Sequence, residues 1–568
     1  MLRTLGALPL LATLAGCPPG ANKIAAGPPR IDAHCHVFNI LDMPAYAFLL
    51  DVVVQNPLLK PIAAPFAKLL VEIVRAPAHS NAEEKVILQA HLVNPTLFPL
   101  PAAAMVANAP ALIASGLLQY IQKYTSINIA NVPLPTTSDY DKLLTDFLLP
   151  LFLPGVPIDP TKTPQQNLQQ NLPAILNGLN DLAKNISAMQ ATVAVNPEVS
   201  VPAYISQFLA YWAPNLAEYR FVLSQNVAGL YNGAQPVFLC PATLDIDKWL
   251  DTKNESPWTR MPDQAELMKL ISLVQPDNRV LHGFIGFDPI RYIDDQKQNV
   301  QMHALKVVKT AIEQQGFIGV KLYPPMGFRA IGNASPPALD FSTLPGIRPY
   351  VITPQMVDAA LTALYDYCNA NEVPIMAHCA PSQGPTPQAA EQAHPKWWAQ
   401  LLSDAKYKST LRVNLGHFGG VWNYDGKAQD PSPWTKEIAD MIQTGGYGFL
   451  YTDLGDFANI LDRDSTDRLQ DIVTQLTSLI NTDTLVRDRI LYGTDWLMLG
   501  IEPGCEKYYD RMNAKIGPAL GVTNLDPLLG GNAVRYLGLA PGQKARMRLE
   551  AFYTANSKDP KKLNLFAA

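Results

Sequence analysis

Eight short apolar runs, separated by longer segments, constrain the fold of this chain more than any other feature of its sequence. The runs cover residues 30–38, 237–244, 280–287, 318–323, 374–379, 412–417, 448–453 and 490–495. Several of the intervening segments have the apolar spacing of amphipathic helices: 302–315, 354–371 and 465–481. Strands that alternate with helices are typical of a parallel sheet, and nearly all-apolar strands are typical of a sheet covered on both faces. Eight such units predict an α/β fold, the closed (β/α)8 or TIM barrel. An open, doubly wound sheet is the alternative, but no run is followed by a glycine-rich phosphate turn.

The first two runs are separated by residues 40–235, which show no strand pattern. Leu- and Ala-rich stretches typical of helices recur there, at about 44–75, 82–94, 111–124, 139–152, 165–190 and 202–230. A loop that leaves the first strand of a barrel emerges on the face that carries active sites. We therefore predict a helical insertion that caps a barrel formed by residues 30–39 and 236–545, followed by a C-terminal tail, 546–568. A dimer contact and a membrane contact are the alternatives for its weakly charged surface.

Composition excludes several classes of protein. The 568 residues include 44 Lys+Arg and 49 Asp+Glu, a formal net charge of −5, so we expect no nucleic-acid partner. Hydrophobic residues make up 48% of the chain, which is too many for a disordered protein. Six cysteines are too few for a disulfide scaffold. We expect a folded protein that acts on a small molecule, as a monomer or a homo-oligomer.

The N-terminus has the pattern of a targeting segment. Residues 1–16 combine Arg3 with an apolar run that is too short to span a bilayer, which is typical of a signal peptide. The sequence LAGC at 14–17 resembles a bacterial lipobox, in which Cys17 receives a lipid and the peptide is cut before it. Residues 17–29 then form a tether. We predict an exported, lipid-anchored protein of the bacterial periplasm or cell envelope, with a plain secretory signal as the alternative.

Four histidines and one aspartate lie at or near the C-terminal ends of predicted strands. His34 and His36 are two residues apart on the first strand, so both imidazoles point to the same face. His378, His417 and Asp495 end three later strands. All five side chains should therefore converge at the C-terminal mouth of the barrel. Imidazoles with a carboxylate are typical ligands of a catalytic divalent metal ion, and zinc is the ion we expect.

Taken together, these segments resemble the amidohydrolase superfamily, in particular the amidohydrolase-related branch that includes aminocarboxymuconate-semialdehyde decarboxylase. The matching pieces are IDAHCHVF at 31–38, GFIGVKLYPPMGF at 316–328, VPIMAHCAPSQG at 373–384, LRVNLGHFGG at 411–420, RILYGTDW at 489–496 and GGNAVRYLGL at 530–539. Their order, spacing and local context agree, and the resemblance covers about 30–38 and 236–540. It does not extend to the insertion or to the tail.

The resemblance implies that His34, His36, His378 and Asp495 bind one divalent metal ion. It also implies that Asp495 and His417 act in catalysis, with Asp495 accepting a proton from water and His417 contacting water or substrate. In members of the superfamily that bind two metal ions, a lysine at the position of Lys321 is carboxylated and bridges the two ions. Lys321 and His417 are therefore candidates for a bridging or second-metal role, although we favour one ion over two.

Three further residues are candidates for substrate binding. Tyr323 and Arg329 follow the strand at 318–323 and are placed to bind a substrate carboxylate, and Asp453 ends the strand at 448–453, where it can orient His417 or contact substrate. We expect a hydrolase that cleaves a C–N or C–O bond of a small organic substrate. A non-oxidative decarboxylase of a ring or enoic acid is one alternative, which an Arg329 aimed at the metal would favour. A lipoprotein that binds ligands without catalysis is the other.

Overall fold

The computed structural model describes most of the chain. Described are residues 29–53, 60–101, 161, 213–231, 236–421, 433–461, 473–479, 484–519 and 525–566, apart from 254, 256, 257, 348, 349, 383, 475 and 503. The predicted signal peptide, Cys17 and the tether before Pro29 lie outside these residues. So do the predicted helices at 111–124, 139–152 and 165–190, and most of the one at 465–481.

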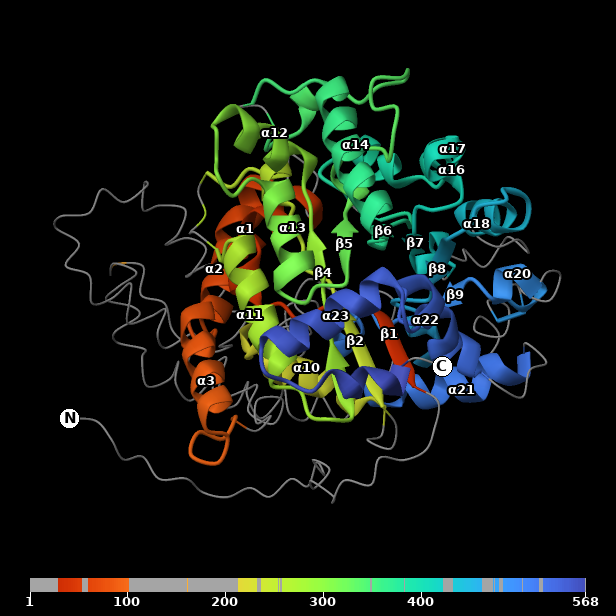
Figure 1. The fold of residues 1–568 in the computed structure, drawn as a ribbon. Coiled ribbons are helices and arrows are strands. Elements are labelled where there is room, and N and C mark those ends of the chain that lie inside the picture. Colours follow the sequence, from red (N-terminus) through yellow and green to blue (C-terminus); the bar gives the residue numbers. More distant parts are fainter. Residues whose placement is uncertain are drawn as a thin grey trace.

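Eight parallel strands form the barrel that the sequence predicts (Figure 1). In chain order they are β1 (Arg30–Cys35), β2 (Val237–Pro241), β3 with β4 (Arg279–Leu281 and Phe284–Gly286), β5 (Gly319–Leu322), β6 (Ile375–His378), β7 (Val413–Gly416), β8 (Leu450–Asp453) and β9 (Ile490–Leu491). The predicted strand at 280–287 is interrupted at His282 and Gly283, so it counts as two short strands. A bridge between Ala242 and Phe284 joins β2 to β4. The Ala33 amide donates to the Tyr492 carbonyl at 3.0 Å, which closes the ring between β9 and β1.

Helices surround the strands on the outside of the barrel (Figure 1). After β2 they are α11 (Met261–Leu273), α12 (Pro289–Lys297), α13 (Ala304–Gln314), α14 (Pro354–Asn371), α15 (Pro387–Ala390), α16 (Lys396–Leu402), α17 (Ala405–Lys408), α18 (Pro433–Thr444), α20 (Thr484–Arg487), α21 (Tyr508–Ala519), α22 (Asn532–Leu537) and α23 (Lys544–Ala555). Local sequence sets their ends. α14, for example, begins after Thr353, whose side chain accepts the Met356 amide, and stops where Glu372 adopts a left-handed conformation. The helices predicted at 302–315 and 354–371 are confirmed as α13 and α14.

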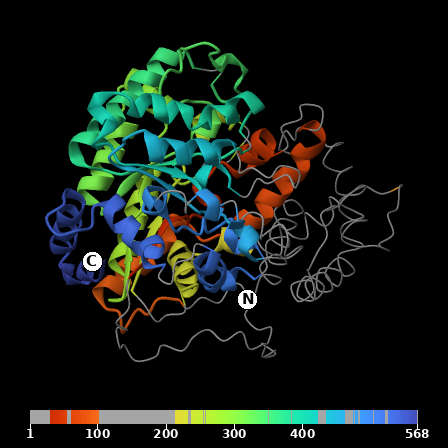
Figure 2. The same cartoon turned by 90° about the vertical axis from the view of Figure 1, so that its right-hand side faces the viewer.

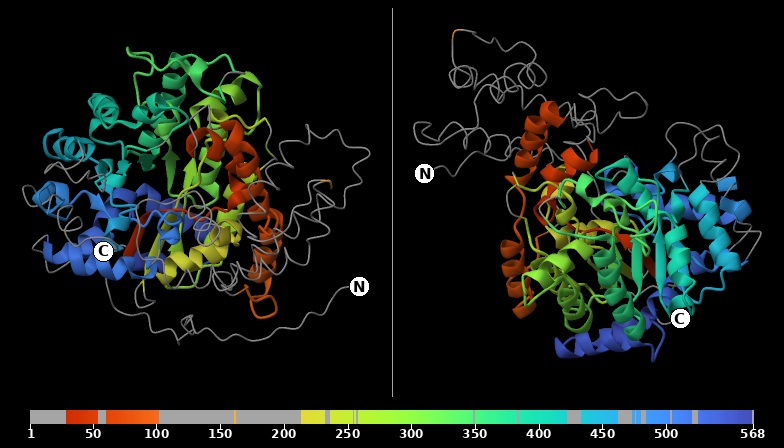
Figure 3. Two further views of the ribbon diagram at one scale, coloured as in Figure 1. Left: turned by 180° about the vertical axis from the view of Figure 1, so that it is seen from behind. Right: turned by 90° about the horizontal axis from the view of Figure 1, so that it is seen from above.

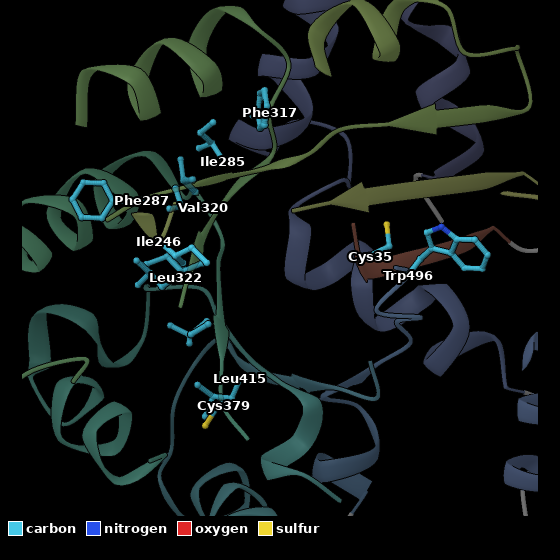
Figure 4. Close-up of a cluster of buried hydrophobic side chains, with 14 of the residues drawn as sticks. Cys35, Ile246, Ile285, Phe287, Phe317, Val320, Leu322, Cys379, Leu415 and Trp496 are labelled. Atoms are coloured by element: carbon cyan, nitrogen blue, oxygen red, sulfur yellow. The ribbon is translucent and has the colours of Figure 1, made fainter. Parts of the chain in front are cut away.

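Alternation along the strands sorts the apolar side chains into two clusters. Between the strands and the helices lie residues such as Val320, Leu322 and Leu415 (Figure 4). A second cluster fills the N-terminal end of the barrel, where Phe284 and Tyr451 lie close to Tyr536 of α22. Each large side chain that is fully buried in this way contributes roughly 1.5–3 kcal/mol to stability. The C-terminal end of the barrel is left to polar residues.

The described parts of the insertion are helical and lie along the flank of the barrel (Figure 2; Figure 3). They are α1 (Ala45–Phe48), α2 (Lys60–Arg75), α3 (Asn81–Val93), α9 (Ala213–Ala217) and α10 (Arg220–Gly229). α3 packs against α11. Buried Arg220 ties the last part of the insertion to its first part, because its guanidinium bonds Asp42 at 2.7 Å and Glu84 at 3.2 Å. The cap remains a prediction, since 102–160 and 162–212 lie outside the described residues.

The chain after α22 belongs to the base of the barrel. α23 begins at Lys544, shortly before the predicted tail, and packs against α13. Leu563 and Phe566 of the following short helix (Pro560–Phe566) are fully buried in the cluster at the N-terminal end. Within the described parts of the chain, no helix is long and apolar enough to cross a membrane.

Candidate metal centre

An irregularity in β1 directs its two histidines into the mouth of the barrel. The pairing of β1 with β2 shifts register between Asp32 and Cys35. Ala33 packs in the cluster at the N-terminal end, whereas Cys35 packs in the outer cluster. The inward face therefore changes from odd to even residues at this bulge, and His34 and His36 both face the polar mouth.

His34 is completely buried, and both of its ring nitrogens have partners. Nδ1 lies 3.0 Å from Oδ1 of Asp453, while Nε2 lies 2.9 Å from Nζ of Lys321 and 3.4 Å from Oδ1 of Asp495. Burial lowers the pKa of His34 to about 4, so the ring is neutral near pH 7. An ionised carboxylate only accepts hydrogen bonds. Nδ1 therefore carries the hydrogen and Nε2 presents its lone pair to the mouth.

His36 has the same arrangement with a different anchor. Its Nδ1 lies 2.8 Å from the carbonyl oxygen of Ala242, which can only accept, so in a neutral ring the lone pair is on Nε2. Nε2 points at Oδ1 of Asp495, 3.1 Å away. Two lone pairs thus converge on one anionic oxygen.

This convergence fits a metal ion. His34, His36 and Asp495 are buried, and their ligand atoms lie within 4.8 Å of one another. Three electron-rich atoms at such distances repel unless a cation lies between them, and nitrogen with carboxylate oxygen is a donor set that zinc accepts. A second group of this kind consists of His34, His417 and Asp453. We favour the first, because hydrogen-bond donors already surround the Asp453 carboxylate.

His378 and His417 form a pair beside this group. Nδ1 of His417 lies 3.1 Å from the Gly455 carbonyl oxygen, and Nε2 lies 3.0 Å from Nδ1 of His378. The carbonyl places a hydrogen on His417 Nδ1, so in neutral rings His378 Nδ1 donates to His417 Nε2. The lone pair of His378 is then on Nε2, which is buried and has no hydrogen-bond partner among the described residues. His378 is therefore suited to be a further ligand, with His417 orienting it.

Asp453 contacts both His34 and the backbone of His417, and so connects the candidate ligands to the histidine pair. Its carboxylate accepts hydrogen bonds from Nδ1 of His34, from Nδ2 of Asn414 at 2.6 Å and from the amides of His417 and Gly455 at 3.0 and 2.9 Å. Burial opposes ionisation, but His34 and these bonds hold the pKa of Asp453 well below its usual range. The fully buried carboxylate orients His34 and the His417 backbone, and substrate contact by Asp453 stays a prediction.

Lys321 lies inside the mouth at the end of β5. Its Nζ donates to Nε2 of His34 at 2.9 Å and lies 3.4 Å from Sδ of Met376. Burial lowers the pKa of Lys321 to about 8, which brings the neutral amine within reach of mildly basic pH. Lys321 therefore lies beside a candidate metal ligand, and its bridging or second-metal role stays a prediction.

Comparison with known proteins gives the family. Residues 297–539 match the family model described as amidohydrolase. This match places residues 297–539 in the amidohydrolase superfamily. Among solved structures, an uncharacterized TIM-barrel protein from Bordetella bronchiseptica is similar at 15% sequence identity, with 57% of this chain and 83% of that chain covered and a TM-score of 0.33. No curated protein matches the chain.

The segment that matches the amidohydrolase model contains Lys321, His378, His417 and Asp495 but not β1. His34 and His36 join the group only through the closure of the barrel, which brings β1 against β9. Tyr323 lies above the same mouth of the amidohydrolase barrel, where its ring contacts the His378 ring with centroids 4.8 Å apart. Burial raises the pKa of Tyr323, so its hydroxyl stays protonated.

Arg329 does not take the role that the sequence suggests. Its guanidinium donates to the carbonyl oxygens of Gly332, Ser335 and Pro337 and to the side chain of Gln392, and it stacks on Trp397 with its carbon 4.0 Å from the ring centroid. These contacts occupy four of the five donors that an arginine offers. The expectation that it binds a substrate carboxylate is therefore corrected: in this amidohydrolase Arg329 holds the loop after β5 together.

Sequence reasoning missed Asn414, which fixes the Asp453 carboxylate. The available signal was a polar amide inside the apolar run at 412–417, three positions before His417. Backbone conformation gives another sign of function. His417 and Asp495 have φ angles of 67° and 50°, in the left-handed region that residues other than glycine rarely adopt. Such positions cost about 1–3 kcal/mol each and collect at functional sites.

Proposed function

We propose that this protein is a metal-dependent hydrolase that cleaves a C–N or C–O bond of a small organic substrate. The observation that carries the proposal is the convergence of two imidazole lone pairs, from His34 and His36, on the buried carboxylate of Asp495. This donor set sits at the C-terminal mouth, where barrel enzymes have their active sites.

His34, His36 and Asp495 would hold the ion, with the unpartnered Nε2 of His378 as the fourth ligand. Zinc is the ion that these ligand types favour. When bound, the metal lowers the pKa of a water molecule toward about 7 and polarises a carbonyl group. One ion is supported by the bond between His378 and His417, because a second ion held by both would have to break it.

The surrounding residues prepare this centre for catalysis. Asp453 and the Ala242 carbonyl fix the rings of His34 and His36, so that Nε2 of each faces the mouth. The Asp495 carboxylate is the base nearest to that point, and it can accept a proton from water and return it to the leaving group. Tyr323 and Lys321 supply an O–H and an N–H donor beside the rings of His378 and His34, where they can stabilise a developing negative charge.

Decarboxylation remains an alternative within the superfamily, and the position of Arg329 speaks against it. A decarboxylase must hold the carboxylate of its substrate, and the arginine best placed in the sequence for that task is engaged by loop carbonyls. The binding of a ligand without catalysis is the remaining alternative. The measurement that separates the three is turnover on a panel of amides, lactones and aromatic acids.

The panel is run on protein freed of metal with a chelator and then reloaded with Zn²⁺ or Mn²⁺. We expect hydrolysis of at least one amide or lactone class only after reloading, and none in an Asp495→Ala variant. Release of CO₂ from the acids would instead support a decarboxylase. A fully metallated protein that turns over no compound would favour ligand binding alone.

We further propose that the protein is exported and lipid-anchored at Cys17. The support is the LAGC sequence that follows the apolar run of residues 5–15. Labelling with a fatty acid in a bacterial host tests this, with Cys17→Ser as the control. Label that persists in the variant would contradict the assignment.

A further inference from the structure

Asp32 is a fully buried carboxylate that is not among the candidate metal ligands. It lies on β1, two residues before His34, and its partners come mainly from the loop after β9. Oδ1 accepts the Thr494 amide at 3.1 Å and the His34 amide at 3.3 Å, while Oδ2 accepts the Thr494 hydroxyl at 2.7 Å. Every polar group that faces this carboxylate in these contacts is a donor.

The bonds continue from Thr494 to its neighbours. Oγ1 of Thr494 accepts the Trp496 amide at 3.1 Å, so its own hydrogen is left for Asp32. The Asp495 amide donates to the His34 carbonyl at 2.7 Å, and the His36 amide donates to the Trp496 carbonyl at 2.5 Å. The turn that carries Asp495 is therefore tied at three successive residues to the strand that carries both histidines.

This attachment explains how Asp495 keeps an unfavourable conformation. Its φ of 50° is left-handed and strained for a residue with a side chain. Gly493 allows the close approach on the other side, because a Cβ there would lie 2.8 Å from the His34 Cβ. Without the bonds from Asp32 the turn could relax, and the carboxylate would move away from the lone pairs that it faces.

We propose that Asp32 and Thr494 are positioning residues that lock the Asp495 turn onto β1 and thereby set the geometry of the metal centre. The inference rests on the proposed function, which identifies the bound group as a divalent metal ion. An aspartate is required at position 32, because the amide of an asparagine would direct its own N–H donors at Thr494. A threonine or serine is required at 494, because its hydroxyl must accept from Trp496 while it donates to Asp32.

The test compares Thr494→Val and Asp32→Asn with Thr494→Ser. Zn²⁺ affinity is measured by competition with a chelator, and the absorption spectrum of the Co²⁺-loaded protein reports ligand geometry. We expect Thr494→Val and Asp32→Asn to weaken Zn²⁺ binding by about 10–100-fold, as losses of residues that orient ligands do, and to change the Co²⁺ bands. Thr494→Ser should keep both properties.

Thr452→Val is the matched control. The Thr452 hydroxyl is also buried in the barrel wall and donates to a carbonyl, that of Leu415 at 2.6 Å. Its loss should lower the melting temperature to a similar degree as Thr494→Val without changing the Zn²⁺ affinity or the Co²⁺ spectrum. A purely structural role for Thr494 would make the two variants behave alike.

Hydrogen–deuterium exchange of the segment 490–498 gives a readout that needs no metal. We expect faster exchange in the metal-free forms of Thr494→Val and Asp32→Asn. In Thr494→Val the Trp496 amide loses its acceptor, and in Asp32→Asn the Thr494 amide keeps only a weaker one. Should the wild-type protein bind no divalent metal, the proposed function fails, and exchange alone decides whether the turn is locked. Wild-type exchange, affinity and spectrum in the folded Thr494→Val protein would overturn the proposal, even if Asp32→Asn does not fold.

Discussion

Buried histidines occur at both ends of the barrel, and their surroundings differ. His282 lies at the N-terminal end, in the break between β3 and β4, and is completely buried. Its Nδ1 lies 2.6 Å from the Gly316 carbonyl oxygen, and its Nε2 lies 3.0 Å from the Tyr553 hydroxyl. At the C-terminal end, Nε2 of His378 has no partner in the part of the chain that the structure describes, and Nε2 of His36 faces a carboxylate oxygen.

Burial lowers the pKa of the histidines at both ends of the barrel. It lowers the pKa of His282 to about 3 and that of His34 to about 4, so both rings are neutral near pH 7. The difference lies in what the neutral ring meets. At the base the protein supplies a donor and an acceptor to His282, whereas at the mouth Nε2 of His36 faces a carboxylate oxygen and Nε2 of His378 faces no described partner. A buried ring nitrogen without a partner reduces stability, so the free Nε2 of His378 at the mouth indicates a ligand from outside.

The strongest test of this comparison removes one histidine from each end. His34→Ala or Asp495→Ala should abolish stoichiometric metal binding and activity, because each removes a ligand. His282→Gln should keep its metal. Elemental analysis of the purified proteins is the measurement. A double variant of His34 and His36 that retains one metal ion per chain would show that the site lies elsewhere.

A smaller effect is expected from a change at Asp453, which anchors His34 beneath the mouth. Asp453→Asn keeps the shape of the side chain but places an amide donor against the donors of Asn414, His417 and Gly455. His34 then loses its fixed orientation, and Zn²⁺ affinity should fall by about 10–100-fold. Chelator competition measures this.

Asp245→Asn is the matched control, because Asp245 is also buried but is paired with Arg291. It should leave Zn²⁺ affinity unchanged. An Asp453→Asn protein that binds Zn²⁺ as tightly as the wild type would mean that His34 does not need this anchor.

The sequence was sufficient to predict much of this architecture. The eight apolar runs gave the barrel, and their C-terminal ends gave His378, His417 and Asp495 a common location, because parallel strands end on the same side. Alternation also placed His34 and His36 on one face. These inferences use local periodicity and one rule of topology, which are both present in a single chain.

What escaped prediction depends on contacts between distant segments. Asp453 bonds His34 across 419 residues, and Thr494 bonds Asp32 across 462 residues, with no local pattern to reveal either partner. The break at His282 fell inside an apolar run that looks continuous. Arg329 was misassigned because its loop folds back onto it, so that nearby carbonyls take the donors that a substrate was expected to use.

At the base, the comparison predicts a dependence of stability on pH. The pKa of His282 falls from 6.5 in the unfolded chain to about 3 in the folded one, so between these values the unfolded state binds more protons. The stabilising effect of the neutral ring is complete above pH 6.5 and is lost as pH falls toward 3. Its slope is at most about 1.4 kcal/mol per pH unit.

Denaturant titrations of the wild type and His282→Gln between pH 7 and pH 5 isolate this contribution, because all other groups are shared. We expect the free energy of unfolding to fall more steeply in the wild type than in the variant. Equal slopes would show that the ring is already accessible to protons in the folded protein.

The smallest effect concerns the hydroxyl that satisfies His282. Tyr553→Phe removes the donor to Nε2 and leaves the ring of residue 553 packed in the base. The free energy of unfolding should fall by about 1 kcal/mol, the usual value of one such bond, with metal content unchanged. In a double-mutant cycle with His282→Leu the loss should largely disappear, because no acceptor is then left without a partner. An additive loss would mean that Tyr553 stabilises the base by packing alone. A loss of metal in Tyr553→Phe would instead show that the two ends of the barrel are coupled, and the contrast between a satisfied and an unsatisfied end would no longer hold.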